Sequence, residues 1–179
     1  MKQYSFLTLL IFVSIGLSGC FYSATDLISE ENRVETLAAG EYRALTLDED
    51  GSYSEPEEVW QGEITYRDGR LHSETEDMPL ANAVFMQIDQ HIFAGHANTS
   101  DDDEYVYVLM FAYSDGSYYA HLPMCNRLSA EARVELGFAE EGDRQCALND
   151  TAHLRAVFTT YVEEMGGQIS DGVRLFPVD

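Results

Sequence analysis

Residues 105–123, YVYVLMFAYSDGSYYAHLP, decide the fold of this chain. Two runs rich in aromatic and β-branched residues flank an Asp-Gly pair. This arrangement predicts a β-hairpin, because a type I′ turn needs positive φ at both central residues. A two-residue turn here predicts the cross-strand pairs Tyr113 with Tyr118, Phe111 with Ala120 and Leu109 with Leu122. The run from 105 to 113 is apolar on both faces, so we expect it to be a central strand of the sheet.

Other segments repeat this pattern. Residues 63–74, EITYRDGRLHSE, predict a second Asp-Gly hairpin with Tyr66 opposite Leu71, and further Asp-Gly pairs lie within 49–52 and 170–173. Residues 83–89 and 91–97 are typical of two more strands around a turn near Asp89. Gly95 inside the second of these strands indicates a bulge or a sharp bend.

The pattern changes after residue 123. Residues 127–137 predict a short helix with Ser129 as its N-cap and Gly137 as its stop. Residues 149–167 predict a longer amphipathic helix, capped by Asp150, and residues 172–178 a closing strand. We therefore predict an α+β domain: an antiparallel, β-rich curved sheet or partial barrel with two helices near the C-terminus.

The N-terminal segment, MKQYSFLTLLIFVSIGLSGC, has the order of a secretory signal peptide. Lys2 precedes an uncharged apolar run, which ends in small residues. From Phe6 to Leu17 this run spans 12 residues, whereas a transmembrane helix needs about 20. The segment is therefore interpreted as a signal peptide rather than a membrane span.

LSGC, residues 17–20, resembles the lipobox of bacterial lipoproteins. The resemblance implies cleavage before Cys20, a diacylated Cys20 thiol and often an acylated Cys20 amino group. Phe21 at the next position, in place of Asp, implies sorting to the outer membrane by the enteric rule, with the domain facing the periplasm. The order of lipobox, tether and a GEY strand also resembles many small lipoproteins of Gram-negative bacteria. We expect a signal peptide over 1–19, a lipidated tether over 20–39 and a single α+β domain over 40–179.

The charge of the chain excludes one class of partner. Lys2 is the only lysine, and it lies in the segment that we expect to be removed. The mature chain would therefore carry nine basic residues, all arginine, and 32 acidic residues. Such a charge repels nucleic acid, and we expect no nucleic-acid partner. It fits the generally acidic surface of proteins from halophilic or marine organisms. A dedicated cation-binding function is the alternative, for which Asp101 to Asp103 are the candidates.

Cys125 and Cys146 form an even pair once Cys20 is lipidated. In an oxidising compartment such a pair predicts a disulfide, and the spacing matches neither a CxxC redox motif nor a zinc site.

No pattern of catalytic residues is visible, so we predict no catalytic residue, no metal site and no cofactor. The five histidines, His72, His91, His96, His121 and His153, show no metal-ligand spacing, and no G-x-S-x-G nucleophile elbow occurs. One hypothesis remains a hydrolase built on dispersed residues. It would place His72 or His121 beside an acid or a hydroxyl in a cleft.

The aromatic residues of the 105–123 hairpin are either core or the lining of a ligand cleft. The candidate ligand-facing residues are Tyr107, Met110, Phe111, Tyr113, Tyr118 and His121. The leading hypothesis is a non-catalytic lipoprotein with a binding or assembly domain, anchored in the membrane through Cys20 and meeting a protein partner in the cell envelope. The second hypothesis is a carrier or sensor of a small apolar ligand, with a cavity lined by residues such as Tyr107, Phe111 and Met110.

Overall fold

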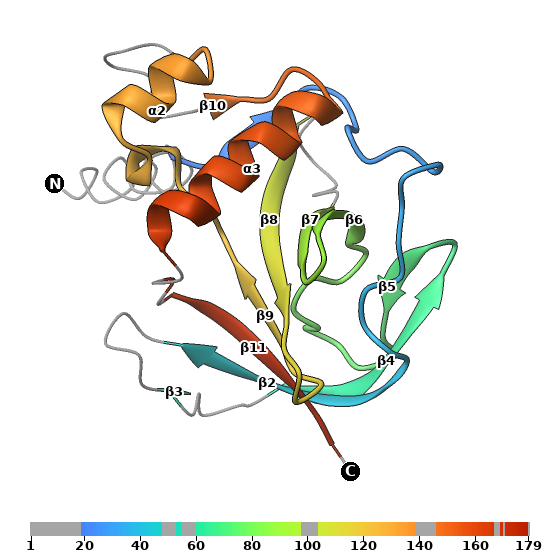
Figure 1. Ribbon diagram of the computed structural model, residues 1–179. Coiled ribbons are helices and arrows are strands. Elements are labelled where there is room, and N and C mark those ends of the chain that lie inside the picture. The colour runs from blue at the N-terminus through green and yellow to red at the C-terminus, as the bar shows by residue number, and fades with distance from the viewer. Residues whose placement is uncertain are drawn as a thin grey trace, which may run out of the picture.

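The computed structural model describes residues 19–47, 53–54, 60–97, 104–138, 146–166, 169 and 171–178. They form an α+β fold in which strands β1 to β11 belong to one open sheet. Figure 1 shows three elements gathered at one end of the sheet: α3 (Thr151–Met165), α2 (Ala130–Glu135) and β10 (Cys146–Ala147). Strand β8 (Tyr105–Ala112) begins at this end, and its turn to β9 (Tyr118–His121) and the C-terminus lie at the opposite end. The predicted fold class is confirmed, with an open sheet rather than a partial barrel.

Strand β8 (Tyr105–Ala112) is central, as predicted. It pairs with β7 (Ile92–Ala97) along one edge. Along the other edge it pairs first with β1 (Phe21–Ser23) and then with β9 (Tyr118–His121). Side chains of β8 enter two cores, because successive residues of a strand point to opposite faces. Leu109 lies in the core beneath α3, and Met110 lies in the core on the other face.

The predicted register of the β8–β9 hairpin is wrong by one residue. Phe111 lies opposite Tyr119, not opposite Ala120. The connection is a three-residue loop: the Tyr113 N–H donates to the Ser117 carbonyl, and Gly116 has a φ of 80°. A hairpin of this type needs one left-handed residue at its end, which glycine supplies without strain. The slip moves Tyr119 to the face of Phe111.

The second Asp-Gly hairpin is confirmed. Strand β4 (Gln61–Arg67) pairs with β5 (Arg70–His72), and Tyr66 lies opposite Leu71. Asp68 and Gly69 have φ values of 54° and 71°, as a type I′ turn requires. The Asp-Gly pair at 50–51 lies outside the described residues.

Strand β6 (Val84–Asp89) pairs with β7, which confirms the two predicted strands. The prediction for Gly95 is wrong, since the register is regular there and shifts between Gln87 and Asp89 instead. Gly95 is needed for another reason: a Cβ atom at this position would overlap the ring of Phe85. The glycine therefore allows a close approach between side chain and backbone.

The rest of the sheet extends from β9. Strand β11 (Gly172–Pro177), the predicted closing strand, lies antiparallel between β9 and β2 (Gly40–Leu47). Strand β2 also pairs with β4 and with β3 (Tyr53–Ser54), while β10 (Cys146–Ala147) runs parallel to β1. At the far edge, Leu71 of β5 exchanges two backbone hydrogen bonds with Asn82 and Ala83, directly before β6.

The helices follow the prediction. The 3₁₀ turn η1 (Cys125–Arg127) leads to α2 (Ala130–Glu135), whose cap Ser129 accepts a hydrogen bond from the Ala132 N–H. Helix α3 (Thr151–Met165) is capped by Asp150, and its buried face consists of Leu154, Val157, Phe158 and Tyr161. No helix in the described part of the chain is long and apolar enough to cross a membrane.

The predicted tether over 20–39 is wrong, because this segment is part of the packed domain. Phe21 and Ile28 lie in the core beneath α3, and Leu37 lies in the core on the opposite face. Polar bonds hold the segment as well: the hydroxyl of Tyr66 accepts from the N–H groups of Thr36 and Leu37. The domain therefore begins at its first strand, β1, and not at residue 40.

Candidate functional site

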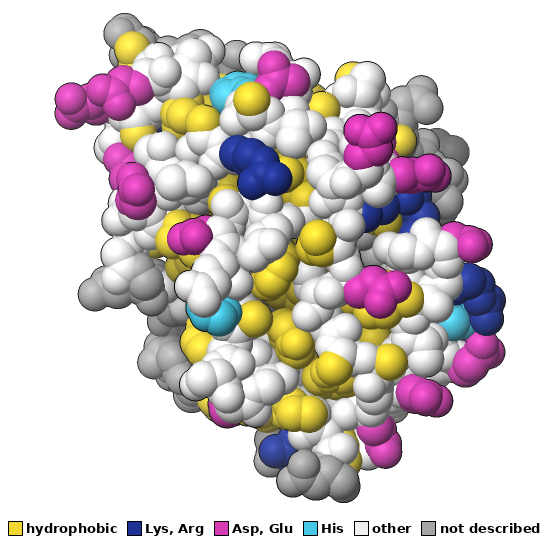
Figure 2. Space-filling model, turned by 45° about the vertical axis from the view of Figure 1, so that its right-hand side comes forward, with side chains coloured by type: hydrophobic (Ala, Val, Ile, Leu, Met, Phe, Trp, Pro, Cys, Tyr) yellow, Lys and Arg dark blue, Asp and Glu magenta, His cyan; other side chains and the backbone are white. Residues whose placement is uncertain are grey.

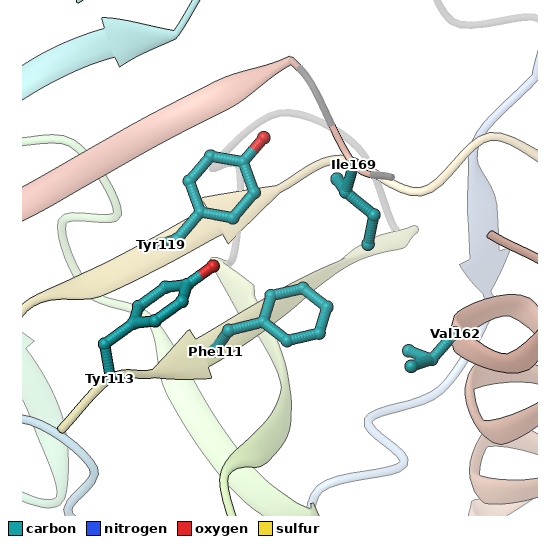
Figure 3. Close-up of a pocket in the computed structure, with 5 residues that line it drawn as sticks. All are labelled: Phe111, Tyr113, Tyr119, Val162 and Ile169. Carbon is teal, nitrogen blue, oxygen red and sulfur yellow. The ribbon is translucent and has the colours of Figure 1, made fainter. Parts of the chain in front are cut away.

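A small apolar pocket opens between the β8–β9 hairpin and the end of α3. Its volume is about 90 Å³, and it is lined by Phe111, Tyr113, Tyr119, Val162 and Ile169. Figure 3 shows the three aromatic side chains together on the hairpin, with Val162 projecting from α3. The rings of Phe111 and Tyr119 are stacked, with centroids 6.2 Å apart. The pocket is therefore walled by aromatic rings on its sheet side.

A partly exposed cluster adjoins this pocket, and we call it the arginine–tyrosine surface. Its members are Arg43, Tyr53, Tyr113, Arg174 and Phe176. The Arg174 guanidinium lies 4.7 Å from the ring centroid of Tyr113 and 4.9 Å from that of Phe176. It also donates to the Tyr53 hydroxyl at 2.8 Å. Tyr113 belongs to both features, so the pocket and the surface are continuous.

Hydrogen bonds within the hairpin loop fix the orientation of Arg174. Its guanidinium donates to the Asp115 carboxylate at 3.1 Å and to the Ser117 hydroxyl at 2.8 Å. Hydrogen bonds from Ser117 lower the pKa of Asp115, and the charge of Arg174 lowers it further. Asp115 is therefore ionised at neutral pH, and the stacked guanidinium is held in one place. A side chain that is preorganised in this way would lose little conformational entropy on contact with another molecule.

Cys20 lies at the opposite end of the domain. It forms a β-bridge with Met124 and is 3% exposed, with its Sγ 3.9 Å from the Met124 Sδ. Tyr22, two residues later, pairs with Val106 at the start of β8. Seven residues of extended chain separate Val106 from Tyr113, which is roughly 23 Å.

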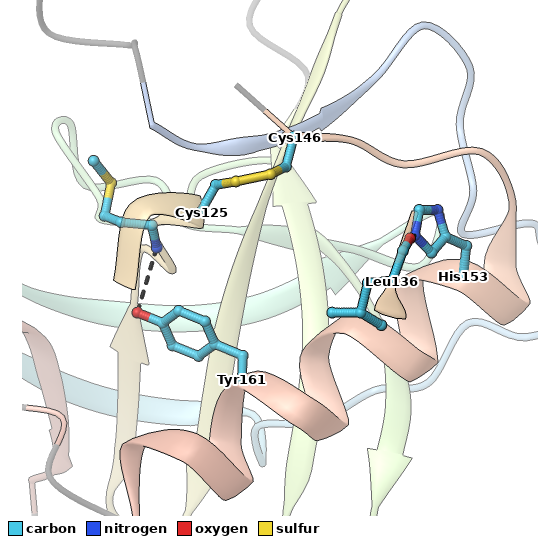
Figure 4. Close-up of a disulfide and its surroundings, with 6 residues drawn as sticks. Cys125, Leu136, Cys146, His153 and Tyr161 are labelled. Atoms are coloured by element: carbon cyan, nitrogen blue, oxygen red, sulfur yellow. Dashed lines mark hydrogen bonds between the residues drawn. A yellow bond between two sulfur atoms is a disulfide. The ribbon is translucent and has the colours of Figure 1, made fainter. Parts of the chain in front are cut away.

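Cys125 and Cys146 form the predicted disulfide, which links η1 to β10. Their Cα atoms are 5.9 Å apart, within the usual range for such bonds. Cys125 directly follows Met124, the bridge partner of Cys20, and Figure 4 shows the disulfide above Tyr161 of α3. The bond therefore lies at the same end of the molecule as Cys20.

His121 was a candidate ligand-facing residue, and the structure contradicts this prediction. The side chain is 1% exposed, and both ring nitrogens have partners. Nδ1 lies 2.7 Å from the Asp171 carbonyl oxygen and Nε2 lies 2.9 Å from the Tyr161 hydroxyl. Because a carbonyl can only accept, Nδ1 carries the proton and Tyr161 donates to Nε2.

The two hydrogen-bond partners of His121, Tyr161 and Asp171, make further hydrogen bonds of their own. The Tyr161 hydroxyl accepts from the Met124 N–H at 3.3 Å, and Arg127 donates two hydrogen bonds to Asp171. Burial lowers the pKa of His121, more than its contacts with Asp171 raise it. The imidazole is therefore neutral and has almost no contact with solvent.

His96 is the other buried histidine, and it holds the N-terminal segment to β7. Its Nε2 lies 2.8 Å from the Asp26 carboxylate, which also accepts from Arg33 at 3.3 Å. Burial lowers the pKa of His96, outweighing the contacts with Asp26 that raise it. Its Nδ1 has no partner among the described residues.

The remaining histidines do not converge. His72 contacts the exposed Glu74 at 2.9 Å, His91 is exposed, and His153 lies 3.0 Å from the Leu136 carbonyl oxygen. Within the described residues, no three His, Cys, Asp or Glu side chains lie close enough to hold a metal ion. Asp101 to Asp103 lie outside those residues. Acidic side chains on the face in Figure 2 are scattered rather than gathered in one patch.

Of the six candidate ligand-facing residues, Phe111 and Tyr113 line the pocket. Burial contradicts the prediction for Tyr107, Met110 and His121, whereas Tyr118 is half-buried and its role stays a prediction. The hydroxyl of Tyr107 bonds to Ser23 inside the core, and Met110 fills the second core. Tyr118 packs against the ring of Tyr42.

Sequence reasoning missed three residues of the pocket and four of the arginine–tyrosine surface: Tyr119, Val162 and Ile169, and Arg43, Tyr53, Arg174 and Phe176. Tyr119 was missed because the register slip placed Ala120 opposite Phe111. Arg174 lies in β11 opposite Tyr119, so a correct order of strands would have brought it to the hairpin.

Comparisons of this chain with known protein families, with curated proteins and with solved structures found no match.

Proposed function

We propose that this chain is a lipid-anchored protein of the bacterial cell envelope, and that it binds a partner protein through the arginine–tyrosine surface and its pocket. The observation that carries the binding proposal is the stacking of Arg174 on Tyr113 at the mouth of the pocket. Tyr and Arg dominate the binding energy of protein interfaces, especially where they surround a pocket. Tyr53 and Tyr113 are 41% and 47% exposed, so a partner can reach both.

The lipobox supports the anchor. Acylation of Cys20 with two or three chains would hold the protein stably on a bilayer, whereas a single chain would not. The disulfide fits an oxidising compartment such as the periplasm. Because Cys20 directly precedes a core strand, the anchor has no spacer, and the arginine–tyrosine surface faces away from the membrane.

The volume of the pocket favours a protein partner over a free small ligand. Small-molecule sites measure about 300–1,000 Å³, and a cavity of about 150 Å³ holds a benzene molecule. At about 90 Å³ the pocket fits one side chain of a partner. The carrier hypothesis also required Tyr107 and Met110 to line a cavity, and both are fully buried in packed cores.

A hydrolase is less well supported than a binding protein. His121 and Tyr161 form the hydroxyl–histidine pair that such an enzyme could use, but neither side chain is open to a substrate. His72 is accessible, and its contact is Glu74 on an exposed surface. We therefore propose a non-catalytic domain.

Metabolic labelling with a clickable palmitate tests the anchor. The native chain should carry label and sediment with membranes, whereas a Cys20→Ser variant should carry none and become soluble. A chain with Cys125→Ala and Cys146→Ala is the control, since it should keep its label. Label retained in the Cys20→Ser variant would refute the anchor.

Photo-crosslinking in intact cells tests the binding surface. A photoreactive residue replaces Tyr113 in one chain and Val134 of α2 in the other. Both positions are 47% exposed, but Val134 lies at the end that carries Cys20. A discrete protein adduct should form at 113 alone and weaken in an Arg174→Ala background. Equal adducts at both positions, or none at 113, would contradict the proposed surface.

A further inference from the structure

The backbone N–H of Cys125 donates a hydrogen bond to the carbonyl of Gly19. Cys125 is fully buried, and the adjacent bridge between Cys20 and Met124 holds the two segments together. The acceptor of this buried N–H thus belongs to the residue just before the proposed cleavage position.

Cleavage before Cys20 would remove that acceptor. The Cys125 N–H would lose its partner in a buried position, where an unpaired donor is costly. The new α-amino group of Cys20 would also be largely protonated at neutral pH, because such groups have a pKa near 7.7–8.0. Cleavage would therefore place a charged donor where a carbonyl had been, at a residue that is 3% exposed.

We propose that acylation of the Cys20 amino group restores this hydrogen bond, with the fatty-acyl carbonyl replacing the Gly19 carbonyl as acceptor for the Cys125 N–H. This inference rests on the proposed lipid anchor. An amide bond forms between the Cys20 nitrogen and the acyl carbon, and the ester bond of a membrane phospholipid breaks. The ammonium form first gives one proton to water, and the second proton that the nitrogen loses goes to the leaving alcohol.

The geometry of the amide explains why the acyl carbonyl can take the position of the Gly19 carbonyl. In the precursor and in the acylated chain, a planar trans amide attaches the carbonyl directly to the Cys20 nitrogen. The oxygen therefore occupies the same position relative to Cys20, and the acyl chain takes the place of the Gly19 Cα. Acylation would also remove the positive charge. The fully acylated chain should thus be the most stable mature form.

The test uses the chains 20–179 and 19–179, which contain every core residue named above. Both carry Cys20→Ser, so that no third thiol exchanges with the disulfide. Neither contains a lysine, and an amine-directed acetylating reagent therefore modifies only the α-amino group. Acetylation of 20–179 should raise the folding equilibrium constant roughly tenfold or more. It should also slow hydrogen exchange at the Cys125 amide.

Chain 19–179 is the matched control, because it retains the Gly19 carbonyl. Without acetylation it should be as stable as acetylated 20–179, and acetylation should change it little. If unmodified 20–179 does not fold, acetylation in denaturant followed by refolding should restore it, and failure to refold would contradict the proposal.

Two further results would overturn the proposal: no change in 20–179, or an equal gain in both chains. The outcome is independent of palmitate labelling, so failure of the anchor and failure of this hydrogen bond are distinguishable.

Discussion

Replacing Tyr161 with Phe should destabilise the domain by about 2–4 kcal/mol. The hydroxyl donates to His121 Nε2 at 2.9 Å and accepts from the Met124 N–H at 3.3 Å. His121 Nε2 would become unpaired in a fully buried place and the Met124 N–H in a partly buried one, at about 1–3 kcal/mol for each group. The Met124 bond is long, so its loss should fall at the low end of that range. The loss is large against a typical domain stability of about 5–15 kcal/mol.

Urea denaturation of chain 19–179 carrying Cys20→Ser measures this loss, with the midpoint expected to fall by roughly 1–2 M. Tyr119→Phe is the matched control, since its buried hydroxyl has no partner among the described residues. Removing that hydroxyl should be neutral or stabilise the fold by up to about 1 kcal/mol. Equal destabilisation by both substitutions would refute the assignment of the Tyr161 network.

Burial lowers the pKa of His96 and of His121 in the folded protein, whereas in the unfolded chain each histidine has a pKa of about 6.5. As the pH falls below that value, the unfolded chain therefore binds more protons than the folded protein. Stability should therefore fall as the pH drops from 7 to 5, by up to about 1.4 kcal/mol per pH unit for each histidine, and a His96→Gln variant with an unchanged slope in denaturation curves would contradict this. Replacing Cys125 and Cys146 with Ala should remove about 3 kcal/mol, because the disulfide closes a loop with a sequence separation of 21. Guanidinium denaturation with no change in midpoint would show that the bond adds no stability. Gly95→Ala should cost about 1–3 kcal/mol, since the new methyl group overlaps an aromatic ring of β6, and a Tm equal to that of the native chain would contradict the close approach.

Local signals in the sequence predicted the elements of the fold but not all of their pairings. The two Asp-Gly hairpins show why. In the β4–β5 turn, Asp68 and Gly69 both adopt positive φ. In the β8–β9 turn only Gly116 does so, and the Asp115 carboxylate accepts a hydrogen bond from Ser117. The dipeptide is compatible with both geometries. The outcome depends on side-chain contacts beyond the turn, and a shift of one residue exchanges the faces of a strand.

The candidate site was harder to predict than the fold, because its members meet through pairings distant in sequence. Tyr113 was identified from the hairpin alone, but Arg174 reaches it only because β11 inserts between β9 and β2. No local pattern encodes that insertion.

The segment from 20 to 39 was predicted as a tether for a related reason. Burial alternates only over the three residues of β1, and the later buried residues, Leu27, Ile28 and Leu37, follow neither a helical nor a strand period, because the segment crosses from one core to the other. Irregular spacing therefore does not imply an unpacked chain. The consequence concerns function: a tether would let the domain reach far from the membrane in any orientation. A packed N-terminus instead fixes the arginine–tyrosine surface at the end opposite the proposed anchor. A partner would then have to approach from the side facing away from the bilayer, which the crosslinking pair at 113 and 134 is designed to test.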